Sequence, residues 1–160
     1  MIADMKVFHW LPCPVVFICT THNDQRDIMT GTAMFVSEKE PLLTISVATG
    51  NLTEKLINAS GTFVLALAAD TQSKLAIQLG SAKGDQVDKY ARFAVDTLPE
   101  NVGHGLVPEG VSAWMTCQVE SDMEIKGYRV FTGRVNAGED LGLPPLVWCQ
   151  DAFWKLASAK

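Results

Sequence analysis

Helix-like patterns in this chain are confined to residues 51–93, and patterns typical of β-strands lie on both sides of that central stretch. The flanking strand patterns cover residues 15–21, 27–37, 42–47, 114–120, 128–135, 146–149 and 153–156. They are rich in β-branched and aromatic residues, or they alternate apolar with polar positions. Because strands and helices do not alternate along the chain, a doubly wound parallel sheet is disfavoured. We expect a mainly β fold, a largely antiparallel barrel with short helices at one side.

Three short helices and one further strand are expected inside the central stretch. Asn51 and Glu54 have the spacing of a capping box, in which two side chains satisfy free backbone N–H groups at the start of a helix. A strand at 62–68 follows, with large apolar residues at alternate positions. Asp70 and Asp85 are the expected caps of the second and third helices, because short polar side chains favour N-cap positions.

The composition suits a single domain, residues 1–160, with a substantial apolar core. Apolar residues make up 48% of the chain, charged residues make up 19%, and the formal net charge is −5. Because nucleic-acid binding requires a positive face, this acidic balance argues against it. No apolar run is long enough to span a membrane, and the first residues, MIADMKVFHWLPCPVV, lack the apolar core of a signal peptide. We therefore expect a cytoplasmic protein that does not enter a membrane.

The cysteines and histidines show no metal-binding pattern. Cys19 and Cys117 lie in apolar runs, where a free cysteine behaves as a small buried hydrophobe. None of the four cysteines forms a C-x-x-C pair, and the histidines are scattered along the chain. We expect Cys19 and Cys117 to occupy core positions, and we expect no metal site.

The first of three polar clusters interrupts a predicted strand and consists of Met29, Thr30, Gly31 and Thr32. Glycine weakens a strand unless a bulge or a closely approaching ligand requires it. Two threonine hydroxyl groups flank this glycine. The cluster is therefore either a bulge whose threonines face water or a place where a ligand contacts the strand.

The second polar cluster lies where a predicted strand runs into the first helix, and it consists of Ser46, Val47, Ala48, Asn51 and Thr53. Free backbone N–H groups at a helix N-terminus attract anions, and small residues let a phosphate approach them. The two interpretations left open are a solvated helix cap and a phosphate site.

The third polar cluster is the turn GSAKGDQVDKY, which contains Ser81, Lys83 and Lys89. The lysines could pair with a phosphate as point charges. They could equally be solvated, with Asp85 and Asp88 capping the third helix. No G-x-G-x-x-G, Walker A, G-x-S-x-G or H-E-x-x-H motif supports another kind of site.

Taken in order along the chain, these segments resemble one known family. A P-x-P-V-V strand, an M-T-G-T strand, a P-L-L-x-I-S-V strand that enters N-x-T-x-x-L-I, the GSAKGDQVDKY turn and a terminal P-L-V-W hairpin follow one another over residues 12–156. The series resembles the flavin reductase-like, FMN-binding split-barrel family, which includes flavoredoxins and NAD(P)H:flavin oxidoreductases. The most specific match is the turn, which is similar to the family's G-S-x-S-G-x-x-V-D-K-F.

This resemblance implies an antiparallel split β-barrel of Greek-key type that binds FMN, or FAD in its place, and forms a homodimer. By the same resemblance, the ribityl chain and flavin ring would be lined by Met29, Thr30, Gly31 and Thr32, and backbone groups along the ring edge would come from Ser46, Val47 and Ala48. The phosphate would be met by Asn51 and Thr53 and enclosed from the other side by Ser81, Lys83 and Lys89. No catalytic acid or base is implied, because the flavin carries the hydride chemistry.

The implied function is that of an NAD(P)H-dependent flavin or ferric reductase. The alternative is a flavoredoxin-like electron carrier that a protein partner reduces, and a monooxygenase or another redox protein is a further partner under either interpretation. Arg129 and Arg134 could meet a phosphate-bearing electron donor, or they could form surface ion pairs.

The chain departs from the family pattern at several positions. Asp27 stands where the family often has Asn, Ala33 stands where Trp is common, and Lys83 replaces a Ser. Many reductases of the family have G-D-H at the start of a late strand, with the His near the nicotinamide. Here the matching residues are Lys126, Gly127 and Tyr128, which puts the use of NAD(P)H in more doubt than the binding of flavin.

Overall fold

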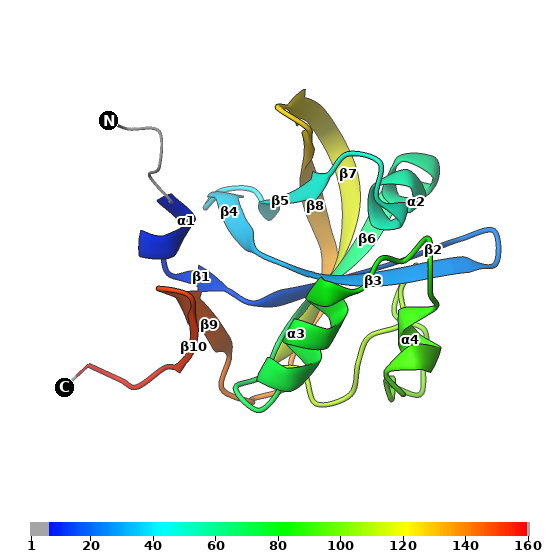
Figure 1. The fold of residues 1–160 in the computed structure, drawn as a ribbon. Helices are drawn as coiled ribbons and strands as arrows, with labels where there is room; N and C mark the ends of the chain where they lie inside the picture. Colours follow the sequence, from blue (N-terminus) through cyan, green and yellow to red (C-terminus); the bar gives the residue numbers. More distant parts are fainter. Residues whose placement is uncertain (1–6, 160) are drawn as a thin grey trace.

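A computed structural model describes residues 7–159 and shows two antiparallel sheets with four helices in that part of the chain (Figure 1). The larger sheet has seven strands in the order β3-β2-β6-β7-β8-β5-β4. Their bounds are β2 Val16–His22, β3 Gln25–Gly31, β4 Ala33–Ser37, β5 Leu42–Ala48, β6 Thr62–Leu67, β7 Ala113–Ile125 and β8 Tyr128–Asp140. The smaller sheet, β1-β9-β10, comprises Cys13–Pro14, Leu146–Cys149 and Ala152–Lys155. The expected mainly β, antiparallel fold is confirmed.

The larger sheet is curled, and its two edge strands are consecutive in the sequence. β3 ends at Gly31 and β4 begins at Ala33, so Thr32 alone connects one edge of the sheet to the other. One residue spans only about 3.5 Å, which brings the two edges together at this point. No ladder joins β3 to β4 in the described residues, so the barrel is split along this seam, as the resemblance implied.

The helices α1 (Val7–Trp10), α2 (Leu52–Ser60), α3 (Ser73–Ser81) and α4 (Lys89–Arg92) lie around the β2–β3 hairpin and the smaller sheet. Figure 1 shows α2 on one side of that hairpin and α3 and α4 on the other. Gly61 ends α2 in the left-handed conformation that glycine adopts most easily, with φ 69°. None of the helices in residues 7–159 is long and apolar enough to cross a membrane.

The apolar core has two parts, which lie on opposite faces of β2 and β6. Val16 and Ile18 of β2 face the barrel interior, where they pack with Ile45, Phe63 and Phe131. The alternate residues Phe17 and Cys19 pack against the layer formed by α3, α4 and the 95–111 loop. Because both faces of these strands are buried, their sequences are almost continuously apolar. Cys19 and Cys117 are buried and free, as predicted.

The long hairpin formed by β7 and β8 extends well beyond the predicted strands at 114–120 and 128–135. Its tip is a turn at Lys126 and Gly127, whose φ angles of 50° and 84° are typical of a type I′ turn. The added residues, 121–125 of β7 near the turn and 136–140 of β8 at the other end of the hairpin, are exposed and mostly polar, so they lack the alternating pattern by which strands are recognised.

Asp70 and Asp85 do not cap α3 and α4, whereas Asp88, which was named with Asp85 as a cap, does cap α4. Gln72, not Asp70, precedes α3, and the Asp70 carboxylate instead lies 3.3 Å from Lys155 Nζ. α4 begins at Lys89, after Asp88, whose carboxylate accepts hydrogen bonds from the backbone N–H groups of the next turn. Asp88 also accepts a hydrogen bond from Arg26 at 2.7 Å, and this bond is the main cause of the lowered pKa of its carboxyl group. Asp85 makes no such cap.

Candidate functional site

An aromatic hollow of about 670 Å³ opens where β3 passes into β4. One wall consists of Met29, Thr30, Gly31 and Thr32 from the junction, with Ser46 and Ala48 from β5. The other walls are aromatic and consist of Phe8 from α1, Tyr128 from β8, and Trp148 and Phe153 from the terminal hairpin. Its volume falls within the range of about 300–1,000 Å³ that small-molecule sites occupy.

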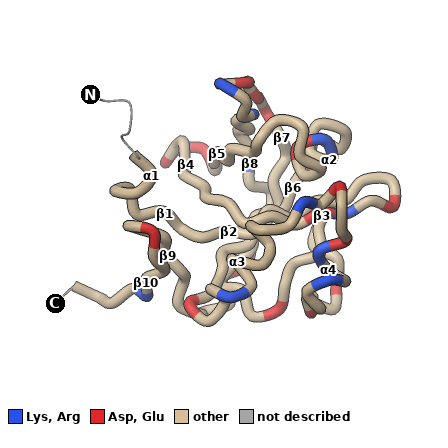
Figure 2. Tube along the Cα trace, viewed as in Figure 1, with Lys and Arg blue, Asp and Glu red and all other residues tan. Residues whose placement is uncertain are grey.

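A second, polar hollow of about 240 Å³ adjoins the aromatic one. It is lined by Asp27 of β3, by Asn51, Leu52 and Thr53 at the start of α2, by residues 79–85, and by Lys89. Met29, Thr30, Asn51 and Gly80 line both hollows, so together they form one elongated space. In Figure 2, blue and red segments lie close together around β3 and α4 near this polar end.

The structure brings together around these hollows every predicted site residue except Val47. The Val47 side chain is fully buried in the barrel interior, so that residue could contribute only backbone groups. Segments that lie far apart in the sequence therefore meet around these two hollows.

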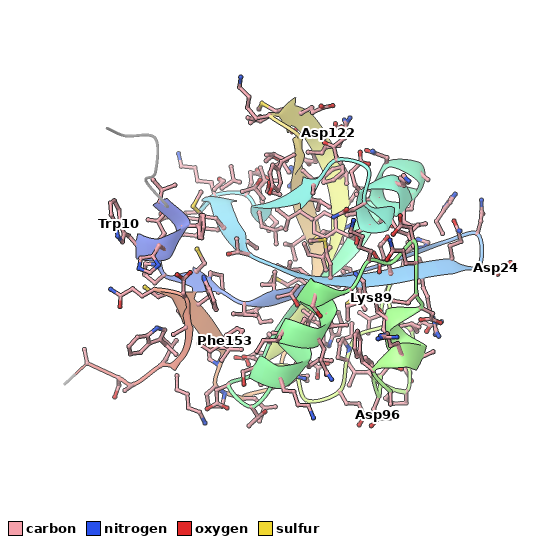
Figure 3. All side chains as sticks on the ribbon, in the orientation of Figure 1. Trp10, Asp24, Lys89, Asp96, Asp122 and Phe153 are labelled. Carbon is pink, nitrogen blue, oxygen red and sulfur yellow. The ribbon has the colours of Figure 1, made fainter. Side chains whose placement is uncertain are left out.

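Lys89 is not the freely available cation that the sequence predicted. Its side chain is only 4% exposed, its Nζ lies 3.2 Å from Asp27 Oδ1, and it donates a 2.8 Å hydrogen bond to the backbone carbonyl of Ile28. Asp27 is equally buried, and its Oδ2 accepts a 2.6 Å hydrogen bond from the Thr53 hydroxyl. A buried ion pair with Asp27 therefore holds Lys89. Figure 3 shows Lys89 beside β3 and the start of α4.

Two other hydroxyl groups in the predicted site donate to helix α3. Thr30 Oγ1 donates to the carbonyl of Ala76 at 2.6 Å, and Ser81 Oγ donates to the carbonyl of Gln78 at 2.9 Å. The Thr30 bond fastens α3 to β3 where the two hollows meet. Each hydroxyl has a single proton, so toward a ligand these groups offer mainly lone pairs.

The N-terminus of α2 faces the polar hollow. Asn51 occupies the N-cap position, but its side chain makes no cap hydrogen bond, and Glu54 accepts from the backbone N–H of Gly50 at 3.3 Å. The predicted capping box is therefore not formed, because Glu54 turns toward Gly50 and toward Arg129, whose Nε lies 2.9 Å away. The first N–H groups of a helix lack intrahelical partners, and the helix dipole places partial positive charge there.

Arg129 and Arg134 form ion pairs on the outside of the barrel. Arg129 pairs with Glu54, Asp122 and Glu124, and Arg134 pairs with Glu40 and Glu120. Arg129 donates to Asp122 and Arg134 donates to Glu40, and these hydrogen bonds are the main reason why the pKa of each guanidinium group is raised. Neither arginine lines either hollow, which favours the ion-pair interpretation over contact with an electron donor.

Sequence reasoning missed the aromatic wall of the site. It assigned no role to Phe8, Trp148 or Phe153, and it considered Tyr128 only as the residue at the position of the family's His, although all four line the aromatic hollow. The rings of Trp148 and Phe153 pack edge to face, with centroids 5.1 Å apart. A signal was present in the aromatic residues of the terminal hairpin, but only the fold brings that hairpin and α1 beside β3.

Comparison with known proteins agrees with this arrangement. The model of the flavin reductase like domain matches residues 8–157. The chain belongs to this family. No curated protein matches the sequence significantly.

Solved structures of flavin reductases and of a flavoredoxin share the fold of this family member. The NADH:FAD oxidoreductase SgcE6 of Streptomyces globisporus C-1027 superposes with a TM-score of 0.85 at 20% identity, over 96% of this chain and 91% of that one. BorF, the flavin reductase component of a bacterial two-component tryptophan halogenase, gives 0.82 at 18% identity, over 96% of both chains. The flavoredoxin of Methanosarcina acetivorans gives 0.82 at 16% identity, over 93% and 87%.

Proposed function

We propose that this chain binds FMN across the two hollows and reduces it with NAD(P)H, passing the electrons to free flavin or to a ferric complex. The observation that carries the proposal is the continuity of the hollows through Met29, Thr30, Asn51 and Gly80. One ligand with a flat aromatic end and an anionic end would occupy both. Membership of the flavin reductase-like family supports the proposal, as does the structure of SgcE6 in complex with NAD and FAD fragments.

The aromatic hollow suits an isoalloxazine ring, which supplies the hydride chemistry when it is bound. Trp148 and Phe153 provide an apolar wall that keeps water away, while the hydroxyl groups of Thr32 and Ser46 lie at the barrel side of the hollow. Ala33, which stands where Trp is common in the family, does not line this hollow, and the aromatic surface comes from the terminal hairpin instead. The chain's part is to bind, orient and desolvate the ring.

The polar hollow suits the ribityl and phosphate end of the ligand. The N-terminus of α2 directs unpaired backbone N–H groups toward it, and the exposed Lys83 supplies a cation. Asn51 lies between the two hollows, where an amide can donate to ribityl hydroxyl groups. These residues hold the ligand and require no proton transfer.

We infer that two copies associate through the face that includes β4. Met34, Phe35 and Val36 of this edge strand are 65%, 67% and 51% exposed, and Met34 and Phe35 border an apolar hollow of about 360 Å³ that Leu42, Leu67 and Met115 also line. An exposed apolar edge of this kind is a common interaction surface. A homodimer and a cytoplasmic location are both parts of this proposal.

The first experiment is an absorption spectrum of the freshly purified protein, followed by titration with FMN and anaerobic addition of NADH or NADPH. We expect saturable FMN binding and bleaching of the flavin absorption by one of the nucleotides. If FMN does not bind, the proposed function is wrong.

A variant tests whether the ligand spans both hollows. Gly80 lies in the last turn of α3, and a Cβ added to it meets nothing closer than 3.7 Å, so Gly80→Val should fold normally. Its side chain would project at the junction of the hollows and should weaken FMN binding at least about tenfold, a loss of about 1.4 kcal/mol. Ala59→Val, at the equivalent position of α2 and outside both hollows, is the matched control and should leave binding unchanged.

The second candidate function is that of a flavoredoxin-like carrier, favoured by Tyr128. This residue matches the position at which many family reductases have a His, it is 52% exposed, and it lines the aromatic hollow. A phenol there would fill space that a nicotinamide needs. Flavin that binds but is reduced by neither nucleotide, and is reduced by a low-potential protein donor, would support this function instead.

A further inference from the structure

The polar hollow has no net formal charge, although it is where the anionic end of the proposed ligand would lie. Its charged side chains are Lys83, Lys89, Asp27 and Asp85, which are two cations and two anions. A site evolved to hold a phosphate dianion tightly would carry an excess of positive charge. The neutrality of this hollow therefore requires an explanation in the residues themselves.

Asp27 neutralises the cation that lies deepest in the hollow. Its Oδ1 lies 3.2 Å from Lys89 Nζ, and the two side chains are 3% and 4% exposed, so solvent screens their attraction little. A phosphate that approached Lys89 would have to compete with this carboxylate and would meet its negative charge.

Asp27 also takes the proton that Thr53 would otherwise offer. The Thr53 hydroxyl donates to Asp27 Oδ2 at 2.6 Å, and a hydroxyl group has only one proton to donate. Toward the hollow Thr53 therefore presents lone pairs, which a phosphate oxygen cannot use. A single carboxylate thus weakens two of the groups predicted at the phosphate.

The surrounding loop fixes Asp27 in this position. A Cβ on Gly84 would overlap the Asp27 carboxylate, so the 80–88 turn passes directly over it and requires glycine at this point. The carboxylate cannot swing out toward solvent without moving this turn. The neutral hollow is therefore a fixed feature of the fold.

We propose that Asp27 determines how strongly this protein holds the phosphate end of its flavin. The proposal rests on the function proposed above. With Asp27 present, the phosphate adds little to affinity, so riboflavin and FMN bind with similar strength. Without the negative charge, Lys89 and Thr53 become available to the phosphate, and FMN is retained.

The test compares riboflavin with FMN by quenching of flavin fluorescence in the wild-type protein, Asp27→Asn and Asp24→Asn. The Asp24→Asn substitution makes the same charge change at the far end of the β2–β3 hairpin, away from Lys89 (Figure 3). The φ of Asp24 is 62°, a left-handed backbone conformation that Asn also adopts readily. We expect Asp27→Asn to bind FMN about tenfold more tightly, with riboflavin changed by less than about twofold. Asp24→Asn should leave both affinities unchanged.

A measurement on the wild-type protein provides a test that does not depend on how Asp27→Asn folds. Its affinities for FMN and riboflavin should agree to within about tenfold, and raising the salt concentration should weaken FMN binding little. An FMN preference well above tenfold, or an Asp27→Asn variant with the wild-type preference, overturns the role of Asp27. If neither flavin binds the wild-type protein, the proposed function fails instead, so the two failures are distinguishable.

Discussion

Replacing Lys89 with Met should destabilise the folded protein strongly, whether or not flavin is present. The substitution keeps an apolar side chain of similar length but removes the charge that faces Asp27 and the donor to the Ile28 carbonyl. The Asp27 carboxylate would remain 3% exposed, with the Thr53 hydroxyl as its hydrogen-bond partner. Breaking a buried ion pair by removing one partner costs about 3–5 kcal/mol. For a domain of this size that corresponds to a fall in Tm of roughly 6–20 °C.

The assay is thermal and urea unfolding of four proteins: wild type, Lys89→Met, Asp27→Asn and the double variant. Because the double variant leaves neither charge buried, it should recover a large part of the stability that Lys89→Met loses. Lys74→Met on the exposed face of α3 is the matched control and should change stability by less than about 0.5 kcal/mol. A Lys89→Met protein within about 1 kcal/mol of wild type, or a double variant that loses the sum of both single effects, would refute the buried-pair argument.

Three further predictions concern other parts of the molecule. Burial raises the pKa of the Cys19 and Cys117 thiols to about 12, so as the pH rises the unfolded chain loses these protons before the folded protein does. The free energy of unfolding should therefore fall by up to about 1.4 kcal/mol per thiol and pH unit between pH 9 and 12. Urea unfolding across that pH range tests this, and a free energy of unfolding that does not change with pH contradicts it. Gly133→Ala should lower the free energy of unfolding by about 1–3 kcal/mol, because its Cβ would lie 2.8 Å from the fully buried Phe63 ring, whereas Gly80→Ala should not lower it. Equal Tm values for the two variants would count against the packing described. Phe35→Glu on β4 should convert a dimer to a monomer in sedimentation velocity, while Leu156→Glu near the C-terminus should not; a wild-type monomer would rule out the inferred interface.

The buried strands could be predicted from the sequence almost to the residue, because each is apolar on both faces. The strands predicted at 15–21 and 62–68 became β2 and β6 with shifts of one residue. Residues 121–125 of β7 and 136–140 of β8 could not be predicted, since exposed strand segments carry no burial pattern. Asp88 caps α4 through one carboxylate oxygen and pairs with the sequence-distant Arg26 through the other, whereas Asp85 makes no cap.

Which segments form the candidate site followed from the order of motifs, but the charge state of the site did not. A sequence shows that Lys89 is a lysine, yet not that Asp27 lies opposite it under a turn closed by Gly84. The aromatic wall was missed for a similar reason. Phe8 and Phe153 come from opposite ends of the chain, and neither belongs to a local pattern that points to a ligand.

Because Thr32 alone connects β3 to β4, the width of the aromatic hollow cannot change without a change in the curvature of the barrel. β3 on one side of the link holds α3 through Thr30, and β4 on the other side carries the exposed apolar face. Inserting one residue beside Thr32 would let the edges of β3 and β4 move apart without breaking the backbone hydrogen bonds that hold either strand in the sheet. The β3–β4 connection is therefore where an insertion would adapt the same barrel to a larger ligand.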